Sequence, residues 1–284
     1  MARDAVQVTL QGDADRVDEL LTGHNPPPSV VAVLRSWMEA HPEYVHGPGT
    51  HTTLYSPDRW RSIEPWPGEM PRSTTDATSI PQTREDVTRI AARCRESGGW
   101  LELLVAAVVW GHKKADYGPA RLAKMLKCPC HHELHQNERQ ARLAAAVELL
   151  DMNGPAVAYQ SLSRQGPNHV PHLGPAFFSK ILYFADRARS APVAIGRPAA
   201  IILDRTTAQR MINVSREYAN DAGILHPDAE RAIYWVWNRT AWSSHRYDVY
   251  CQWSDRCARF MAERYGWPPM ADLIELAIFT APAS

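Results

Sequence analysis

The chain has 284 residues, of which 45% are hydrophobic, and its 31 basic and 31 acidic residues give a formal net charge of zero. This composition predicts a globular protein with a sizeable core, and no apolar run is long enough to cross a membrane. Zero net charge argues against indiscriminate binding to polyanions, although a local basic surface can still bind DNA. Five cysteines without a disulfide framework, and an N-terminus without signal-peptide features, predict a cytoplasmic protein.

The first 82 residues predict a first domain, made of an N-terminal helix and a loop-rich arm. From His41 to Pro81, proline, glycine, histidine and tryptophan replace any regular pattern. Long segments of this kind often contact substrates, so Tyr55, Trp60 and Trp66 are candidate substrate contacts. The alternative is that these aromatic side chains hold the arm against the body of the protein.

Residues 83–284 predict a second domain that is helical throughout. Its first helix begins at Thr83 and is interrupted by Gly98-Gly99. The following stretch, Trp100–Trp110, is apolar nearly all round and predicts a central buried helix. Further helices are expected over residues 138–152, 154–162, 175–185, 206–213, 228–238, 247–265 and 270–279.

A cluster of cysteine and histidine residues at Cys128–His135 contains the side-chain types that bind zinc. Structural zinc sites usually have two or more residues between paired cysteines and a second ligand pair elsewhere, and this cluster has neither. We therefore predict a histidine-rich loop without metal, with a metal-dependent helical protein as an alternative.

The segment Val170–Phe184 predicts a tight turn followed by a helix. Pro175 stands where a helix begins, and the apolar residues after it recur at helical spacing. Gly174 lets the backbone approach a ligand closely, and the N–H groups at the start of a helix suit a phosphate. An ordinary helical hairpin in a core is the alternative interpretation.

Asp204 follows the apolar run Ile201–Leu203 and stands where the next helix begins, which predicts a helix N-cap. Because its neighbours are hydrophobic, we expect the carboxylate to lie against buried surface.

Leu173–Ala185 and Ile202–Arg205 resemble bacterial proteins described as 8-oxoguanine DNA glycosylase (OGG) fold proteins, a branch of the helix-hairpin-helix DNA glycosylase superfamily. The resemblance extends to three further segments, Trp110-Gly111, Tyr117–Arg121 and Ile274–Phe279. It covers roughly residues 100 to 280. It implies an all-α, two-lobed helix-hairpin-helix glycosylase fold in a bacterial cytoplasmic enzyme.

The resemblance also implies roles for individual residues. Asp204 matches the place of the catalytic aspartate. The superfamily's nucleophilic lysine falls at Ala176, and Lys180 lies one helical turn later, so Lys180 is a candidate catalytic residue and AP-lyase activity is left open. The alternative for Lys180 is an exposed helix charge or a phosphate contact. The hairpin is expected to hold the DNA backbone, with a monovalent cation on its carbonyls when DNA is bound and no other cofactor, through Val170, His172, Gly174 and Ala176.

The superfamily hairpin usually has a glycine where this chain has His172. A second set of DNA contacts is implied for the loop that fills the gap left by an extruded base, where the chain has Lys113, Lys114, Tyr117 and Arg121; a solvated turn is the alternative. Most tryptophans should lie in the core, and the side chains expected to line a base pocket are Trp110, Phe177 and Trp235.

The implied activity is excision of a modified base, which the enzyme flips out of double-stranded DNA, leaving an abasic site. The resemblance also implies a link to defence against phages whose DNA carries bulky modified cytosines, such as glucosylated hydroxymethylcytosine. The aromatic-rich arm would suit a roomy pocket for such a base, so we favour this substrate, and hence antiviral defence. The first alternative is an 8-oxoguanine repair glycosylase with lyase activity. The second is a non-catalytic DNA-binding module, which has no need of a carboxylate such as that of Asp204. We expect a monomer.

Overall fold

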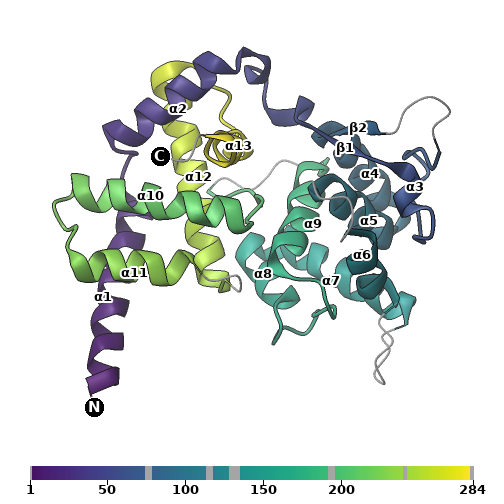
Figure 1. Cartoon of the computed structure of the whole chain (residues 1–284), viewed down its shortest axis with the longest axis horizontal. Helices are drawn as coiled ribbons and strands as arrows, with labels where there is room; N and C mark the ends of the chain where they lie inside the picture. Colours follow the sequence, from purple (N-terminus) through teal and green to yellow (C-terminus); the bar gives the residue numbers. More distant parts are fainter. Residues whose placement is uncertain are drawn as a thin grey trace. The chain divides into compact units, whose positions relative to one another are not determined.

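The structure is a computed structural model that describes residues 2–73, 79–112, 118–127, 135–190, 196–238 and 242–281. These residues are predominantly helical, with one two-stranded antiparallel sheet (Figure 1). The predicted all-α fold class is therefore confirmed. The chain divides into two compact units, one formed by Met1–Pro48 with Ile201–Ser284 and the other by Gly49–Ala200. The expected domains, 1–82 and 83–284, group the chain differently.

The unit Gly49–Ala200 is organised around a helix that is apolar on nearly every side. Seven consecutive side chains of this helix, α5, are fully buried, from Leu103 to Val109. Helices α4, α6, α7 and α9 all contact it, which explains why it has no polar face. The elements of this unit are β1 (Thr52–Tyr55), α3 (Pro57–Trp60), β2 (Ile80–Thr83), α4 (Arg84–Ser97), α5 (Trp100–Gly111), α6 (Gly118–Lys127), α7 (Gln136–Asn153), α8 (Pro155–Leu162) and α9 (Pro175–Arg187). A short 3-10 turn, η2 (Pro48–Thr50), precedes β1.

Helix α4 begins and ends where the sequence predicts. The Thr83 hydroxyl accepts from the Asp86 N–H at 3.0 Å, while the Asp86 carboxylate accepts from the Thr83 N–H at 2.8 Å. This reciprocal pair satisfies two N–H groups that a helix start would otherwise leave open. The helix ends at Gly98, whose φ of 77° is left-handed and therefore suits glycine.

The other unit consists of the first two helices and the last four (Figure 1). Helices α10 and α11 pack side by side, and α1 contacts α10, α11 and α12. Trp237, Trp242 and Trp253 are buried here, as expected for most tryptophans of this region. The elements are α1 (Ala2–Gly23), α2 (Pro28–Ala40), η1 (Pro42–Tyr44), α10 (Arg205–Asp221), α11 (Pro227–Trp237), α12 (Ser244–Tyr265) and α13 (Ala271–Thr280).

The arm is more regular than the prediction of a loop-rich segment. Its residues Thr52–Tyr55 pair antiparallel with Ile80–Thr83, and Leu54 faces Pro81 in the register. A proline is tolerated because each strand of a two-stranded sheet is an edge strand. Across the described residues, no helix combines the length and the apolar character needed to span a membrane.

Candidate active site

The predicted helix-turn-helix segment is present. The backbone conformation of its turn bears on the histidine found there. The Leu173 N–H donates to the Val170 carbonyl oxygen at 3.1 Å, which closes the turn. Between them, His172 has a φ of 66°. This left-handed conformation favours glycine, and histidine enters it more readily than most other residues. His172 is exposed, whereas Val170 is fully buried and anchors the turn.

Helix α9 starts directly after this turn. Its N-cap residue is Gly174, which provides no side-chain hydrogen bond to the first turn, and Pro175 follows. The positive end of the helix dipole is thus not covered by a capping side chain of that residue, which suits an anion. Gly174 itself has an ordinary extended backbone with a φ of −86°. Glycine is therefore not required there by backbone conformation.

Lys180 is buried rather than an exposed helix charge, which corrects one of its two predicted alternatives. Only 5% of the residue is exposed, and its Nζ donates to the Ala176 carbonyl oxygen at 3.0 Å. Its Nζ also lies 6.0 Å from the centre of the Phe177 ring. The aliphatic part of the side chain lies against Gly111 at the end of α5.

Two side chains approach the Phe177 ring, one from α6 and one from the residue that follows α5. The Arg121 guanidinium lies over its ring at 4.6 Å from the centroid, and the His112 ring stacks on it at 6.0 Å with an interplanar angle of 20°. The structure therefore brings together four predicted residues of one unit: Ala176, Phe177, Lys180 and Arg121. Gly111 and His112 were not predicted as site residues. Their sequence signals were the place of both beside the predicted DNA-contacting loop and, for Gly111, the resemblance at Trp110-Gly111.

Trp110 and Trp235, both expected in a base pocket, lie in different surroundings. Trp110 is 4% exposed and packs edge-on against His51 and Phe184 in the core of its unit. The Arg84 guanidinium lies over the Trp110 ring at 5.2 Å. Trp235 belongs to the other unit, where it is half-buried on α11 and lines a pocket of about 220 Å³ together with other residues of that unit.

Asp204 caps α10, as predicted. Its Oδ1 accepts from the Thr207 N–H at 3.0 Å and from the Thr207 hydroxyl at 3.2 Å. The carboxylate is half-buried, and the preceding Ile201–Leu203 is fully or almost fully buried. The Tyr247 hydroxyl donates to the Ile201 carbonyl oxygen at 2.8 Å, which holds this approach in place. The orientation of the carboxylate is therefore set by two hydrogen bonds and a rigid run of buried backbone.

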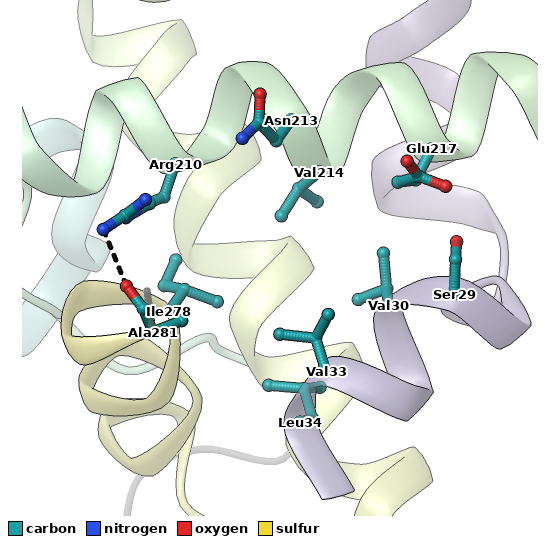
Figure 2. Close-up of a pocket in the computed structure, with 10 residues that line it drawn as sticks. All are labelled: Ser29, Val30, Val33, Leu34, Arg210, Asn213, Val214, Glu217, Ile278 and Ala281. Atoms are coloured by element: carbon teal, nitrogen blue, oxygen red, sulfur yellow. Dashed lines mark hydrogen bonds between the residues drawn. The ribbon is translucent and has the colours of Figure 1, made fainter. Parts of the chain in front are cut away.

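The helix that Asp204 caps also borders an apolar pocket of about 310 Å³, further along its length (Figure 2). Val214 of α10 faces Val30 and Val33 of α2 across this pocket. The Arg210 Nη2 at its edge donates to the Ala281 carbonyl oxygen at 2.6 Å. Asp204 is not among the residues that line it.

The aromatic residues of the arm are buried, and two of them bond to the backbone of the arm itself rather than to the body of the protein. Tyr55, Trp60 and Trp66 are all buried. The Trp66 indole donates to the Met70 carbonyl oxygen at 2.7 Å, and the Tyr55 hydroxyl donates to the Pro71 carbonyl oxygen at 3.1 Å.

Three of the expected DNA contacts, Lys113, Lys114 and Tyr117, lie outside the described residues, as do residues 128–134 of the cysteine and histidine cluster. Within the part of the chain that is described, no group of three or more histidine, cysteine, aspartate or glutamate residues is arranged to hold a metal ion.

Comparison with known proteins gives one match. No curated protein and no solved structure matches the chain. A family match covers residues 46–279, which include the hairpin, Lys180 and Asp204. This span is well over half of the chain, and the family indicates a DNA glycosylase that acts on damaged bases. The chain belongs to the family described as 8-oxoguanine DNA glycosylase OGG-like protein.

Proposed function

We propose that this protein excises a damaged base from double-stranded DNA by hydrolysis and leaves an abasic site. The observation that carries the proposal is the hairpin that ends in α9. The left-handed backbone of His172 directs the chain toward the start of α9. The N-cap residue of that helix, Gly174, provides no side-chain hydrogen bond to its first turn. Backbone N–H groups at such a helix start can hold a DNA phosphate without reading the sequence.

Asp204 is the proposed catalytic carboxylate. Breaking the bond between base and sugar develops positive charge on the deoxyribose, which a fixed carboxylate stabilises. The same carboxylate can orient a water molecule and accept its proton. Thr207 bonds to one oxygen, Oδ1, so the cap fixes the direction in which the carboxylate points.

The buried position of Lys180 favours hydrolysis over a reaction through a Schiff base. Its Nζ is committed to the Ala176 carbonyl oxygen, and its stem is enclosed beside Gly111. To attack C1′ of the sugar, the amine would first have to break this hydrogen bond and leave a buried position. We therefore propose that Lys180 supports the start of α9 and that AP-lyase activity is absent.

8-Oxoguanine is the first proposed substrate because the family description names it. Glucosylated hydroxymethylcytosine in phage DNA, which would make the protein an antiviral defence enzyme, is the second. The argument for it was a roomy pocket lined by the aromatic residues of the arm, and it is weaker because Tyr55, Trp60 and Trp66 are buried in packing of their own.

The test measures release of free base from a duplex containing 8-oxoguanine and from glucosylated phage DNA. We expect excision by the wild type and a loss of at least about 100-fold in Asp204→Asn. Asparagine caps a helix as well as aspartate does, so the fold should be kept. Asp221→Asn, an exposed change at the other end of α10, is the matched control and should retain activity.

Other outcomes select other functions. Release from phage DNA alone would establish the modified-cytosine enzyme. A covalent adduct trapped by borohydride in the wild type and lost in Lys180→Gln would establish the lyase. If both DNAs are bound and neither loses a base, the protein is a DNA-binding module and the proposal is wrong.

A further inference from the structure

Arg205 is the first residue of α10 and directly follows the proposed catalytic carboxylate, Asp204. Its side chain is exposed. Among the residues that the structure describes, none forms a hydrogen bond, an ion pair or a ring contact with its guanidinium. Neither the packing of α10 nor the proposed reaction has so far given this arginine a role, and its charge is accessible to a ligand.

A cation at this place is unfavourable for the helix itself. The first turn of a helix carries the positive end of the helix dipole, which favours acidic side chains there and disfavours basic ones. The described first turn of α10 contains no acidic residue. The Asp204 carboxylate caps the helix through Thr207 and, in the described structure, is not ion-paired with Arg205. Natural proteins break such local rules mainly at functional or strained sites.

The reaction proposed for Asp204 would bring phosphates close to Arg205. The sugar that loses its base is bonded through its 3′ and 5′ oxygens to two phosphates. A carboxylate brought to that sugar is repelled by both negative charges, and a neighbouring cation offsets the repulsion. Consecutive Cα atoms lie about 3.8 Å apart, so Asp204 can act on the sugar while the long side chain of Arg205 reaches an adjacent phosphate.

The chemistry of the side chain fits this ligand. A guanidinium presents N–H donors in a planar fork that matches two phosphate oxygens. The other exposed residues on the first turns of α10, Thr206 and Gln209, are neutral and can donate hydrogen bonds to phosphate oxygens as well. We propose that Arg205 binds a phosphate beside the target nucleotide and so holds its sugar against Asp204. The inference rests on the proposed function, because it takes Asp204 to be the residue at the sugar.

The experiment measures the affinity of the full-length protein for a duplex with one tetrahydrofuran residue, the uncleavable analogue of an abasic nucleotide. This probe does not depend on which base is excised. We expect Arg205→Gln to bind about tenfold more weakly. The slope of log Kd against log salt concentration should fall by about one, because one phosphate contact is lost. Arg205→Lys keeps the charge and should keep most of the slope.

Arg264→Gln is the matched control. Arg264 is another exposed arginine of the same unit, in the last turn of α12. It lies about 25 Å along that helix from Tyr247, whose hydroxyl bonds to the backbone leading to Asp204. The control should bind like the wild type. Arg205→Gln should melt at or above the wild-type temperature, because a cation leaves the positive end of α10, so its weaker binding would not be a loss of fold.

Uncharged methylphosphonates, placed one at a time on either side of the tetrahydrofuran, locate the contact. One of the two replacements should weaken the wild type and have little further effect on Arg205→Gln, because both changes remove the same interaction. Equal weakening of both proteins by each replacement would overturn the inference. Wild-type affinity and salt slope in Arg205→Gln would overturn it as well.

Base release separates this inference from the proposed function. Asp204→Asn should lose excision and still bind the tetrahydrofuran duplex, with the same dependence on Arg205. If the wild type releases no base, yet Arg205→Gln binds more weakly and no longer responds to the methylphosphonate, excision is wrong and the phosphate contact stands. If the wild type excises and Arg205→Gln binds equally well, excision stands and the contact is wrong.

Discussion

Gly111 and Lys180 come from different helices and lie in direct contact: a Cβ added at residue 111 would be 2.6 Å from the Lys180 Cε and 2.8 Å from its Cδ. The absence of a side chain at Gly111 is what leaves room for the buried lysine stem. This contact joins the end of α5 to the first turns of α9, next to the hairpin.

Gly111→Ala should therefore destabilise the protein by about 1–3 kcal/mol, because overpacking forces buried groups to shift. Lys180→Ala should relieve the clash, so the double variant should be more stable than the sum of the two single effects, by about 0.5–3 kcal/mol. Urea unfolding measures all three. Gly12→Ala in α1 is the control, since nothing lies within 4 Å of a Cβ there. Additive effects would show that the two residues do not compete for space.

At His172, the left-handed backbone predicts a rank order of substitutions. His172→Gly should be neutral or slightly stabilising, because glycine adopts a φ of 66° without strain. His172→Val should destabilise by about 1–2 kcal/mol, because the branched Cβ of valine clashes in this conformation, which the unbranched Cβ of histidine tolerates. Thermal unfolding and DNA affinity should follow the same order. Equal stability of the glycine and valine variants would contradict the assigned conformation.

The Asp18 and Arg246 side chains form a buried ion pair that ties α1 to α12, with 8% and 6% of their side chains exposed. Arg246 also lies over the Trp237 ring at 4.9 Å. Arg246→Met should destabilise by about 1.5–3 kcal/mol, since the Asp18 carboxylate would lose its guanidinium partner and keep only the hydrogen bond with His245 Nε2 at 2.9 Å. Arg259→Met, which breaks a surface pair with Asp255 on the same helix, should cost about 0–1 kcal/mol. Similar unfolding midpoints for the two variants would rule out the buried pair as a major contribution.

Cys94 predicts a fall in stability at alkaline pH. Burial raises the pKa of its thiol from 9.0 to about 12, and the thiol donates to the Gly99 carbonyl oxygen at 3.0 Å. The folded protein thus keeps a proton that the unfolded chain releases above pH 9. The stability that this retained proton gives the folded state is complete below about pH 9 and is lost as the pH rises from about 9 to about 12. The free energy of unfolding, measured from pH 8 to 10, should fall less steeply with pH in Cys94→Ala than in the wild type. An unchanged slope would count against this assignment.

The sequence alone determined much of the local structure. The apolar stretch of α5, the cap at Thr83 and the proline at the start of α9 each act within a few residues, so their signals can be read from a short window. Asp204 was identified as a cap from a local pattern, an apolar run followed by a helix, whereas its candidate catalytic role came from the family resemblance.

Only the tertiary structure decided which residues meet. The pairing of Thr52–Tyr55 with Ile80–Thr83 was missed because two four-residue strands, one with a proline, carry little periodicity. The burial of Lys180 depends on the missing side chain at Gly111, far away in the chain. The grouping of the first helices with the last ones likewise arises from long-range contacts, and propensity and spacing contain no information about such contacts.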